Sequence, residues 1–184
     1  MACLFGIFNL CKFKNVNNRK MMNELKHIKS ADIEEFTLNG MKTIAKVVEI
    51  YDGDTCKIVF PLDNKLVKYT CRLQGLDAPE MKPLLSNINR ENEMKHAHES
   101  RNRLIQLATN CKIEIACDEK KSFIKELVNN NTRIIYVELF EFDKYGRLLI
   151  KIYENDRYEK SVNQILIDEH YCVSYDGGTK RAFV

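Results

Sequence analysis

Three carboxylates lie where predicted strands end. Asp54 follows a tight Asp-Gly turn, and Asp77 and Glu80 lie in the loop after the alternating stretch Leu66–Leu73. None of the three belongs to an apolar pattern. Hard divalent cations prefer such oxygen ligands, and Ca²⁺ accepts irregular shells that include backbone carbonyls. Each motif alone is more typical of an ordinary turn than of a metal site, so the interpretation depends on what accompanies them.

Two arginines accompany the carboxylates. Arg72 ends the polar face of its strand immediately before the acidic loop, and Arg147 begins a strand immediately after a glycine turn. A guanidinium offers paired donors that match phosphate oxygens, and beside a metal ion it can stabilise the charge that develops on a phosphodiester. The combination predicts metal-assisted hydrolysis of a phosphodiester.

Short strands must position these residues. The stretch 43–51 is rich in Ile and Val, an Asp-Gly hairpin signal follows, and a β-rich pattern resumes over 55–60. The stretch Leu66–Leu73 alternates apolar and polar residues after a turn over 61–65. Further strands are expected over 111–117, 132–142 and 147–153.

Two helices are expected beside the strands, with a third short one at Phe123–Val128. An apolar stripe through Met94, Ala97, Leu104 and Ala108 predicts a helix between residues 89 and 110. A capping box at Ser161 and Gln164 marks the start of the next. The expected fold is therefore α+β and mainly β: a five-stranded OB-fold barrel with two to three packed helices.

Four motifs resemble the staphylococcal-nuclease-like family, which includes thermonuclease (micrococcal nuclease). They occur in the family's order and span most of residues 43–178: Tyr51-Asp52-Gly53-Asp54-Thr55, Cys71-Arg72-Leu73-Gln74-Gly75-Leu76-Asp77-Ala78-Pro79-Glu80, Asp143-Lys144-Tyr145-Gly146-Arg147 and Val162-Asn163. The resemblance implies an OB-fold and a Ca²⁺-dependent endonuclease or exonuclease that acts on DNA, RNA or both and leaves 3′-phosphates.

The resemblance also implies roles for individual residues. The metal would be held by the carboxylates of Asp54 and Asp77 and by the backbone carbonyl of Ala78. The scissile phosphate would be held by Arg72 and Arg147, and Glu80 would orient or deprotonate the attacking water. Lys144 and Tyr145 match phosphate-contacting positions, and Tyr175 approximates a base-stacking tyrosine.

Two departures from the family pattern stand out. The family's type member has Thr where Ala78 stands, but a backbone carbonyl serves from either residue. The stretch 118–131 is longer than the family's connection at that point, and both a surface insertion and a substrate-facing flap fit it.

Composition limits the alternatives. A chain of 184 residues that is 45% hydrophobic and 30% charged suits one domain and excludes disordered and collagen-like classes. We expect an N-terminal extension over 1–41, a staphylococcal-nuclease-like domain over 42–178 and a tail over 179–184. The net charge of +3 does not by itself indicate nucleic-acid binding.

The cysteines and the apolar N-terminus bear on location. Seven cysteines without a C-x-x-C spacing favour reduced thiols in an intracellular, cytoplasmic protein. The apolar run 1–11 is too short to span a bilayer, so we favour a segment that packs on the domain or frays. The alternative is a palmitoylated peripheral membrane anchor at Cys3 and Cys11. No obligate protein partner is indicated.

A second functional class remains open, because a fold does not determine a function. The same barrel serves equally well as a catalytically silent module that binds nucleic acid or protein. The discriminating feature is the joint presence of Asp54, Arg72, Asp77, Glu80 and Arg147. A silent module has no need of all of them, so the sequence favours the nuclease.

Overall fold

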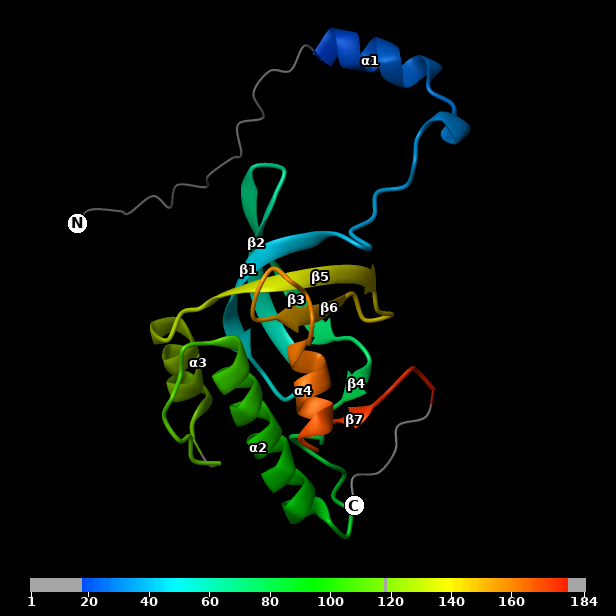
Figure 1. Cartoon of the computed structure of the whole chain (residues 1–184). Helices are drawn as coiled ribbons and strands as arrows, with labels where there is room; N and C mark the ends of the chain where they lie inside the picture. The colour runs from blue at the N-terminus through cyan, green and yellow to red at the C-terminus, as the bar shows by residue number, and fades with distance from the viewer. Residues whose placement is uncertain (1–17, 118, 179–184) are drawn as a thin grey trace, which may run out of the picture. The chain divides into compact units, whose positions relative to one another are not determined.

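The computed structural model describes residues 18–117 and 119–178, and the chain divides into two units between Thr37 and Leu38. The described part of the first unit contains helix α1 (Asn18–His27) and the short 3₁₀ helix η1 (Ser30–Asp32), and the side chains of residues 20–27 are exposed (Figure 1). None of the helices within the described ranges is long and apolar enough to cross a membrane. Cys3, Cys11 and the tail 179–184 lie outside the described residues.

The second unit is built on a closed five-stranded barrel of the OB-fold-like kind (Figure 1). Around the barrel the strand order is β1-β2-β3-β6-β5, and every neighbouring pair is antiparallel except β3 with β6. The predicted fold class is confirmed. The strands are β1 (Lys42–Ile50), β2 (Thr55–Leu62), β3 (Lys65–Leu73), β5 (Ile134–Phe142) and β6 (Leu148–Tyr153).

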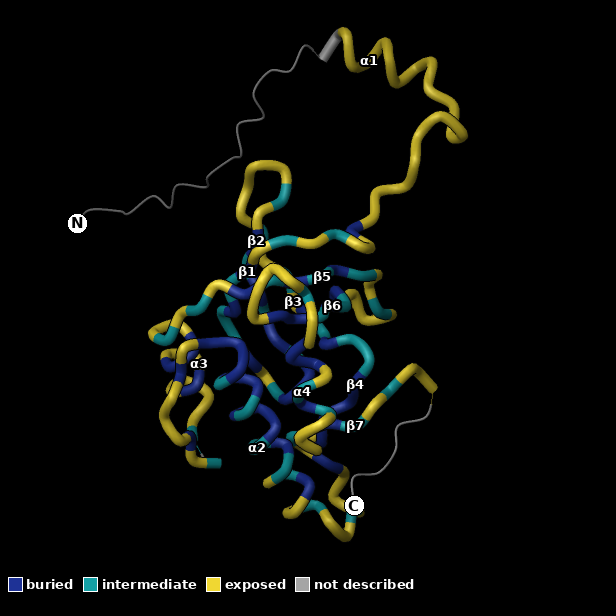
Figure 2. The backbone as a smooth tube through the Cα atoms, viewed as in Figure 1, coloured by how far each residue is buried: buried dark blue, intermediate teal, exposed yellow. Residues whose placement is uncertain are grey.

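Alternate residues along these strands are buried, and their side chains fill the barrel. Within β2, Cys56, Ile58 and Phe60 are buried while the residues between them are only partly covered. The β2–β3 hairpin closes through Asp63 and Asn64, which have φ values of 48° and 61°. Positive φ at both turn residues matches the right-handed twist of the flanking strands, and Asp and Asn tolerate it. Figure 2 shows buried positions along the strands of the barrel and along the helices that cover it.

Three helices pack on this barrel. They are α2 (Arg90–Ala108), which contacts β1; α3 (Lys121–Asn130), which also contacts β1; and α4 (Val162–Asp168), which contacts α2 and β6.

The predicted N-cap of α4 is confirmed, because the Ser161 side chain accepts a hydrogen bond from the Gln164 N–H at 3.1 Å. The reciprocal half of the capping box is not formed, since the Gln164 side chain donates to Asp168 at 2.7 Å.

The predicted strand over 111–117 is wrong. Both edges of β1 are already paired, with β2 and with β5, so the closed barrel offers no edge there. The segment is held by side chains instead: the Asn102 amide donates to the Ile115 carbonyl at 2.8 Å, and the Cys111 N–H donates to the Thr109 hydroxyl at 3.1 Å. A segment with alternating apolar residues can thus be buried without belonging to a sheet.

A small two-stranded sheet was not predicted from the sequence. Strand β4 (Leu76–Asp77) pairs antiparallel with β7 (Val173–Ser174). Strands of two residues carry too little pattern to be recognised in a sequence. This pairing brings the segment after α4 beside the acidic loop, and it continues as the Tyr175 N–H donates to the Gly75 carbonyl at 3.0 Å.

Deletion of residues 1–37 should leave the barrel folded with its melting temperature nearly unchanged, because these residues form a unit separate from the one that contains the barrel. Deletion of residues 1–40 should lower the free energy of unfolding by about 2 kcal/mol, since it also removes Leu38, which is only 4% exposed. Thermal unfolding of the two truncated proteins tests this. Equal melting temperatures would show that Leu38 adds nothing to the core.

Candidate active site

The connections at one end of the barrel enclose a cavity of about 1050 Å³. All the residues predicted for the site line this cavity, with one exception: Asp54, Arg72, Ala78, Glu80, Lys144, Tyr145, Arg147 and Tyr175. The exception is Asp77, which is 1% exposed and reaches the cavity through its contact with Arg72. Residues that come from distant segments of the sequence therefore meet in one place.

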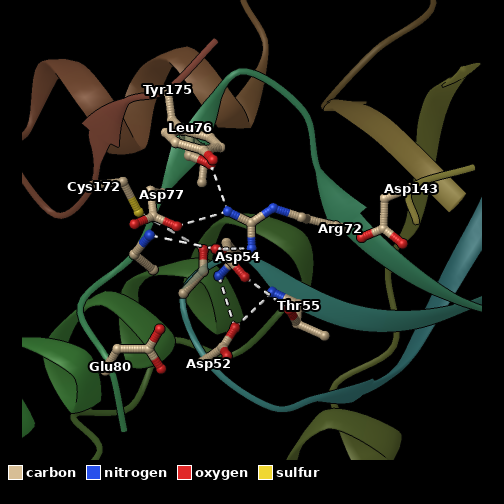
Figure 3. A network of polar contacts seen from close by, with 12 residues as sticks. Asp52, Asp54, Thr55, Arg72, Leu76, Asp77, Glu80, Asp143, Cys172 and Tyr175 are labelled. Carbon is tan, nitrogen blue, oxygen red and sulfur yellow. Dashed lines mark hydrogen bonds and ion pairs between the residues drawn. The ribbon is translucent and has the colours of Figure 1, made fainter. Parts of the chain in front are cut away.

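Arg72 joins the two aspartates at the centre of the site (Figure 3). Its Nη1 lies 2.5 Å from Asp54 Oδ2, and its Nη2 lies 2.7 Å from Asp77 Oδ1. Nη2 also donates to the Leu76 carbonyl at 3.2 Å. Asp54 and Asp77 are 4% and 1% exposed, so both charges are shielded from water and their interactions with Arg72 are strong.

The β1–β2 turn positions Asp54. Asp52 Oδ1 accepts the N–H groups of Asp54 at 3.0 Å and Thr55 at 2.7 Å, which fixes the turn, and the Thr55 hydroxyl donates to Asp54 Oδ1 at 2.7 Å. Gly53 allows α2 to approach, because a Cβ at this position would lie 1.9 Å from Ser100 Oγ. The Asp-Gly-Asp-Thr turn is therefore required both for packing against α2 and for the hydrogen bonds that position Asp54.

Negative charge accumulates at this turn. Burial, followed by repulsion from Asp54, raises the pKa of Asp52 to about 7. For Arg72, burial lowers the pKa, but attraction to Asp54 and Asp77 outweighs it, so the pKa is raised overall and the guanidinium stays charged. Clustered carboxylates of this kind are stabilised by a nearby cation.

The resemblance implies a calcium ion at this centre, and the residues present include oxygen donors of the kind that calcium prefers. Asp54 and Asp77 supply carboxylate oxygens, and the Ala78 backbone lies beside them, with its N–H 3.4 Å from Asp54 Oδ2. In the described part of the chain, no three His, Cys, Asp or Glu side chains form a group that could hold a metal. The set implied by the resemblance contains only two carboxylates and a backbone carbonyl, so it does not need such a group.

Asp143 positions Arg147 and was missed in the sequence. Its Oδ2 accepts from Arg147 Nε at 2.7 Å, and its Oδ1 accepts the N–H groups of Tyr145 and Arg147, both at 2.9 Å. Burial raises the pKa of Asp143, but these bonds outweigh it and hold the pKa below its usual value, so the carboxylate remains ionised. Asp at the first position of a glycine-containing turn is the signal that could have indicated this role.

Thr55 connects the two arginines. Arg147 Nη1 donates to the Thr55 hydroxyl oxygen at 3.3 Å, and the same hydroxyl donates to Asp54, which binds Arg72. A continuous polar chain therefore runs from Arg147 to Arg72 across the cavity wall. Thr55 was part of a recognised motif, but its bridging role depends on the barrel bringing β6 beside β3.

Glu93 positions the loop that carries Glu80. Glu93, which is 8% exposed, accepts the Glu80 N–H at 3.2 Å on Oε1 and the Asn87 amide at 2.6 Å on Oε2. Both ends of the 80–87 loop are thereby tied to α2, while the Glu80 residue itself is exposed. Glu93 lies within a polar helical stretch, so the sequence does not distinguish it from the solvent-exposed residues around it.

Aromatic rings border the cavity. Tyr145 is 73% exposed, and Lys144 Nζ lies 5.1 Å from the centre of its ring. Tyr175 is partly buried, with Arg72 Cζ 6.0 Å from its ring centre. Accessible rings beside cationic groups are suited to stacking bases of a single strand.

If the cavity cleaves phosphodiesters, as the sequence predicts, replacing Arg72 or Arg147 by Lys should lower kcat by about 10²-fold. Lys offers a point charge, whereas each guanidinium here uses separate nitrogens for separate partners. Single-turnover rates of variants with native circular dichroism measure the effect. Wild-type rates in both folded variants would assign these arginines to structure alone.

No protein-family model matches the chain, and a search of curated proteins found no match. The assignment of the site therefore rests on the four motifs and on the geometry described above.

Proposed function

We propose that the protein is a Ca²⁺-dependent nuclease that hydrolyses phosphodiester bonds of DNA, RNA or both and leaves 3′-phosphates. The observation that carries this proposal is the convergence of Asp54, Arg72, Glu80 and Arg147 on one cavity, with Asp77 bound to Arg72. Two guanidinium groups, buried carboxylates and an exposed carboxylate in one open cavity match the needs of phosphodiester hydrolysis.

Each residue has a defined task in this proposal. Asp54, Asp77 and the Ala78 carbonyl would hold the metal, which when bound would supply positive charge to stabilise the negative charge that develops on the phosphate. Arg72 and Arg147 bind the phosphate oxygens. Asp143 keeps the Arg147 guanidinium oriented through the 2.7 Å bond to Nε.

Glu80 takes a proton from the attacking water. The water oxygen forms a bond to phosphorus, the bond from phosphorus to the 5′ oxygen breaks, and the leaving oxygen takes up a proton from solvent water to become a 5′-hydroxyl. The phosphate stays on the 3′ side. Anchoring of the Glu80 backbone to buried Glu93 holds the base in place, which a proton transfer in the transition state requires.

The alternative function is a catalytically silent OB-fold module that binds nucleic acid or protein. One observation favours it: Arg72 already binds Asp54 and Asp77 and also donates to the Leu76 carbonyl. A guanidinium with this many protein partners has fewer donors left for a phosphate. The exposed Glu80 carboxylate favours the nuclease, because in a module that only binds a strand it would repel the phosphates.

The chemistry of the product ends tests the proposed reaction. A 5′-labelled single strand of DNA and one of RNA are incubated with the purified full chain and Ca²⁺, Mg²⁺ or chelator. We expect cleavage with Ca²⁺ and product ends that a polymerase extends only after phosphatase treatment. Products with free 3′-hydroxyls, or equal cleavage in excess chelator, would contradict the proposal.

A further inference from the structure

A second cavity, of about 380 Å³, lies against the first. Its wall includes residues of α3, β1, β2, β3 and α2, and it shares Tyr51 and Thr55 with the wall of the large cavity. The two cavities therefore adjoin each other at Tyr51 and Thr55.

Basic residues dominate the charge of the second cavity. Four of its lining residues are basic, namely Lys57, Arg101, Lys121 and Lys125, and one is acidic, Glu49. Glu49 lies 2.8 Å from Lys57 Nζ and 3.5 Å from Lys125 Nζ, so it neutralises only part of this charge. The surplus positive charge is complementary to an anion.

Arg101 is the most unusual of these residues. It is 3% exposed, and its Nε and Nη2 both donate to the neutral Asn102 side chain, at 3.1 and 2.8 Å. Within the described ranges no carboxylate forms an ion pair with it, although Glu119 attracts it electrostatically from a longer distance. Buried arginines are normally paired with an anion, so this guanidinium beside a cavity indicates a place for one.

The rest of the wall suits an aromatic base. Tyr51 is 50% exposed, and Lys121 Nζ lies 5.1 Å from the centre of its ring. Ile124 of α3 and Met81 of the acidic loop add apolar surface to the same cavity. A half-exposed ring, apolar side chains and cations together are the features by which proteins hold single-stranded nucleic acid.

We propose that this second cavity is a nucleotide subsite for a single strand whose scissile phosphate lies in the large cavity. The flanking base stacks on Tyr51, and Lys121, Lys125 and Arg101 contact the adjoining backbone phosphates. The inference rests on the proposed function and extends it. It also assigns α3, within the stretch longer than the family's connection, to substrate binding rather than to a plain surface insertion.

The lysines allow a test that leaves the fold intact, because Arg101 also holds Asn102 and its replacement would disturb the neighbouring segment. The full chain carrying Lys121→Gln and Lys125→Gln is compared with wild type and with Lys65→Gln, an exposed lysine of the β2–β3 hairpin outside both cavities. Binding of a labelled single strand of about 12 nucleotides is followed by fluorescence anisotropy in chelator. The same titrations are repeated over a range of salt concentrations.

We expect the double variant to bind more weakly and to show a salt dependence reduced by about 0.7 in log K against log salt for each lost phosphate contact. Lys65→Gln should match wild type. Tyr51→Ala should weaken binding about tenfold, and Tyr51→Phe should restore it, because the stacking ring is kept.

The outcomes separate this proposal from the proposed function. If wild type binds the strand and the double variant binds equally well with an unchanged salt slope, the subsite is refuted and the nuclease stands. If wild type binds no strand with or without Ca²⁺, both the subsite and the proposed nuclease function are refuted. A loss of affinity that Lys65→Gln reproduces would show general charge attraction and would also overturn the subsite.

Discussion

Replacing Asp77 by Asn should reduce Ca²⁺-dependent cleavage on the order of 10³-fold. Asn keeps the shape of the side chain but removes one of the two carboxylates proposed to hold the metal. It also removes the charge that fixes Arg72 through the 2.7 Å contact with its Nη2. Both the metal and the phosphate-binding guanidinium are thus affected by one substitution, which is why the effect should be large.

The matched control is Asp63→Asn in the exposed β2–β3 hairpin. Asp63 has a φ of 48°, which Asn adopts as readily, so this variant removes a carboxylate without strain and should cleave at the wild-type rate. Single-turnover rates over a range of Ca²⁺ concentrations measure both variants, and thermal unfolding confirms that they are folded. Wild-type cleavage by folded Asp77→Asn at low Ca²⁺ would remove Asp77 from the metal site.

Replacing Glu80 by Gln should lower the single-turnover rate by about 10²–10⁴-fold while leaving affinity for the strand intact. Gln cannot accept the proton of the attacking water. The proposed phosphate contacts of Arg72 and Arg147 are not touched, and the loop should keep its place because its bond to Glu93 is made by the backbone.

The control for this variant is Glu159→Gln, an exposed glutamate outside the large cavity. Anisotropy with the same oligonucleotide provides the binding readout. A Glu80→Gln protein that cleaves as fast as wild type would leave the nuclease standing but deprive Glu80 of its role. A variant that loses binding together with cleavage would make Glu80 a structural residue.

The barrel was predictable because its strands carry their own pattern. In β3 the alternation places Cys71 and Leu73 in the core, both fully buried, and the expected helix over 89–110 matches α2. Local turn chemistry likewise predicted the N-cap at Ser161. Where burial of one face is the main constraint on a helix or strand, the apolar pattern of the sequence predicts that element directly.

The site was predictable only in part, for a physical reason. Asp54, Arg72 and Arg147 stood out because their neighbours form recognisable turns. Glu93 acts through burial and through contacts with Glu80 and Asn87, and Arg101 was missed because it is buried beside a cavity. Both lie in a polar helical stretch that looks solvated in the sequence. The failed strand over 111–117 has the same origin, since only the closed barrel shows that no edge remains for it.

The central claim is that this cavity hydrolyses phosphodiester bonds rather than merely holding a strand. The most direct test measures binding and single-turnover cleavage of one labelled oligonucleotide by the wild-type chain, side by side, with Ca²⁺ and with excess chelator. We predict binding in both conditions and cleavage only with Ca²⁺. Binding without cleavage under any divalent ion would contradict the claim and establish the silent module instead.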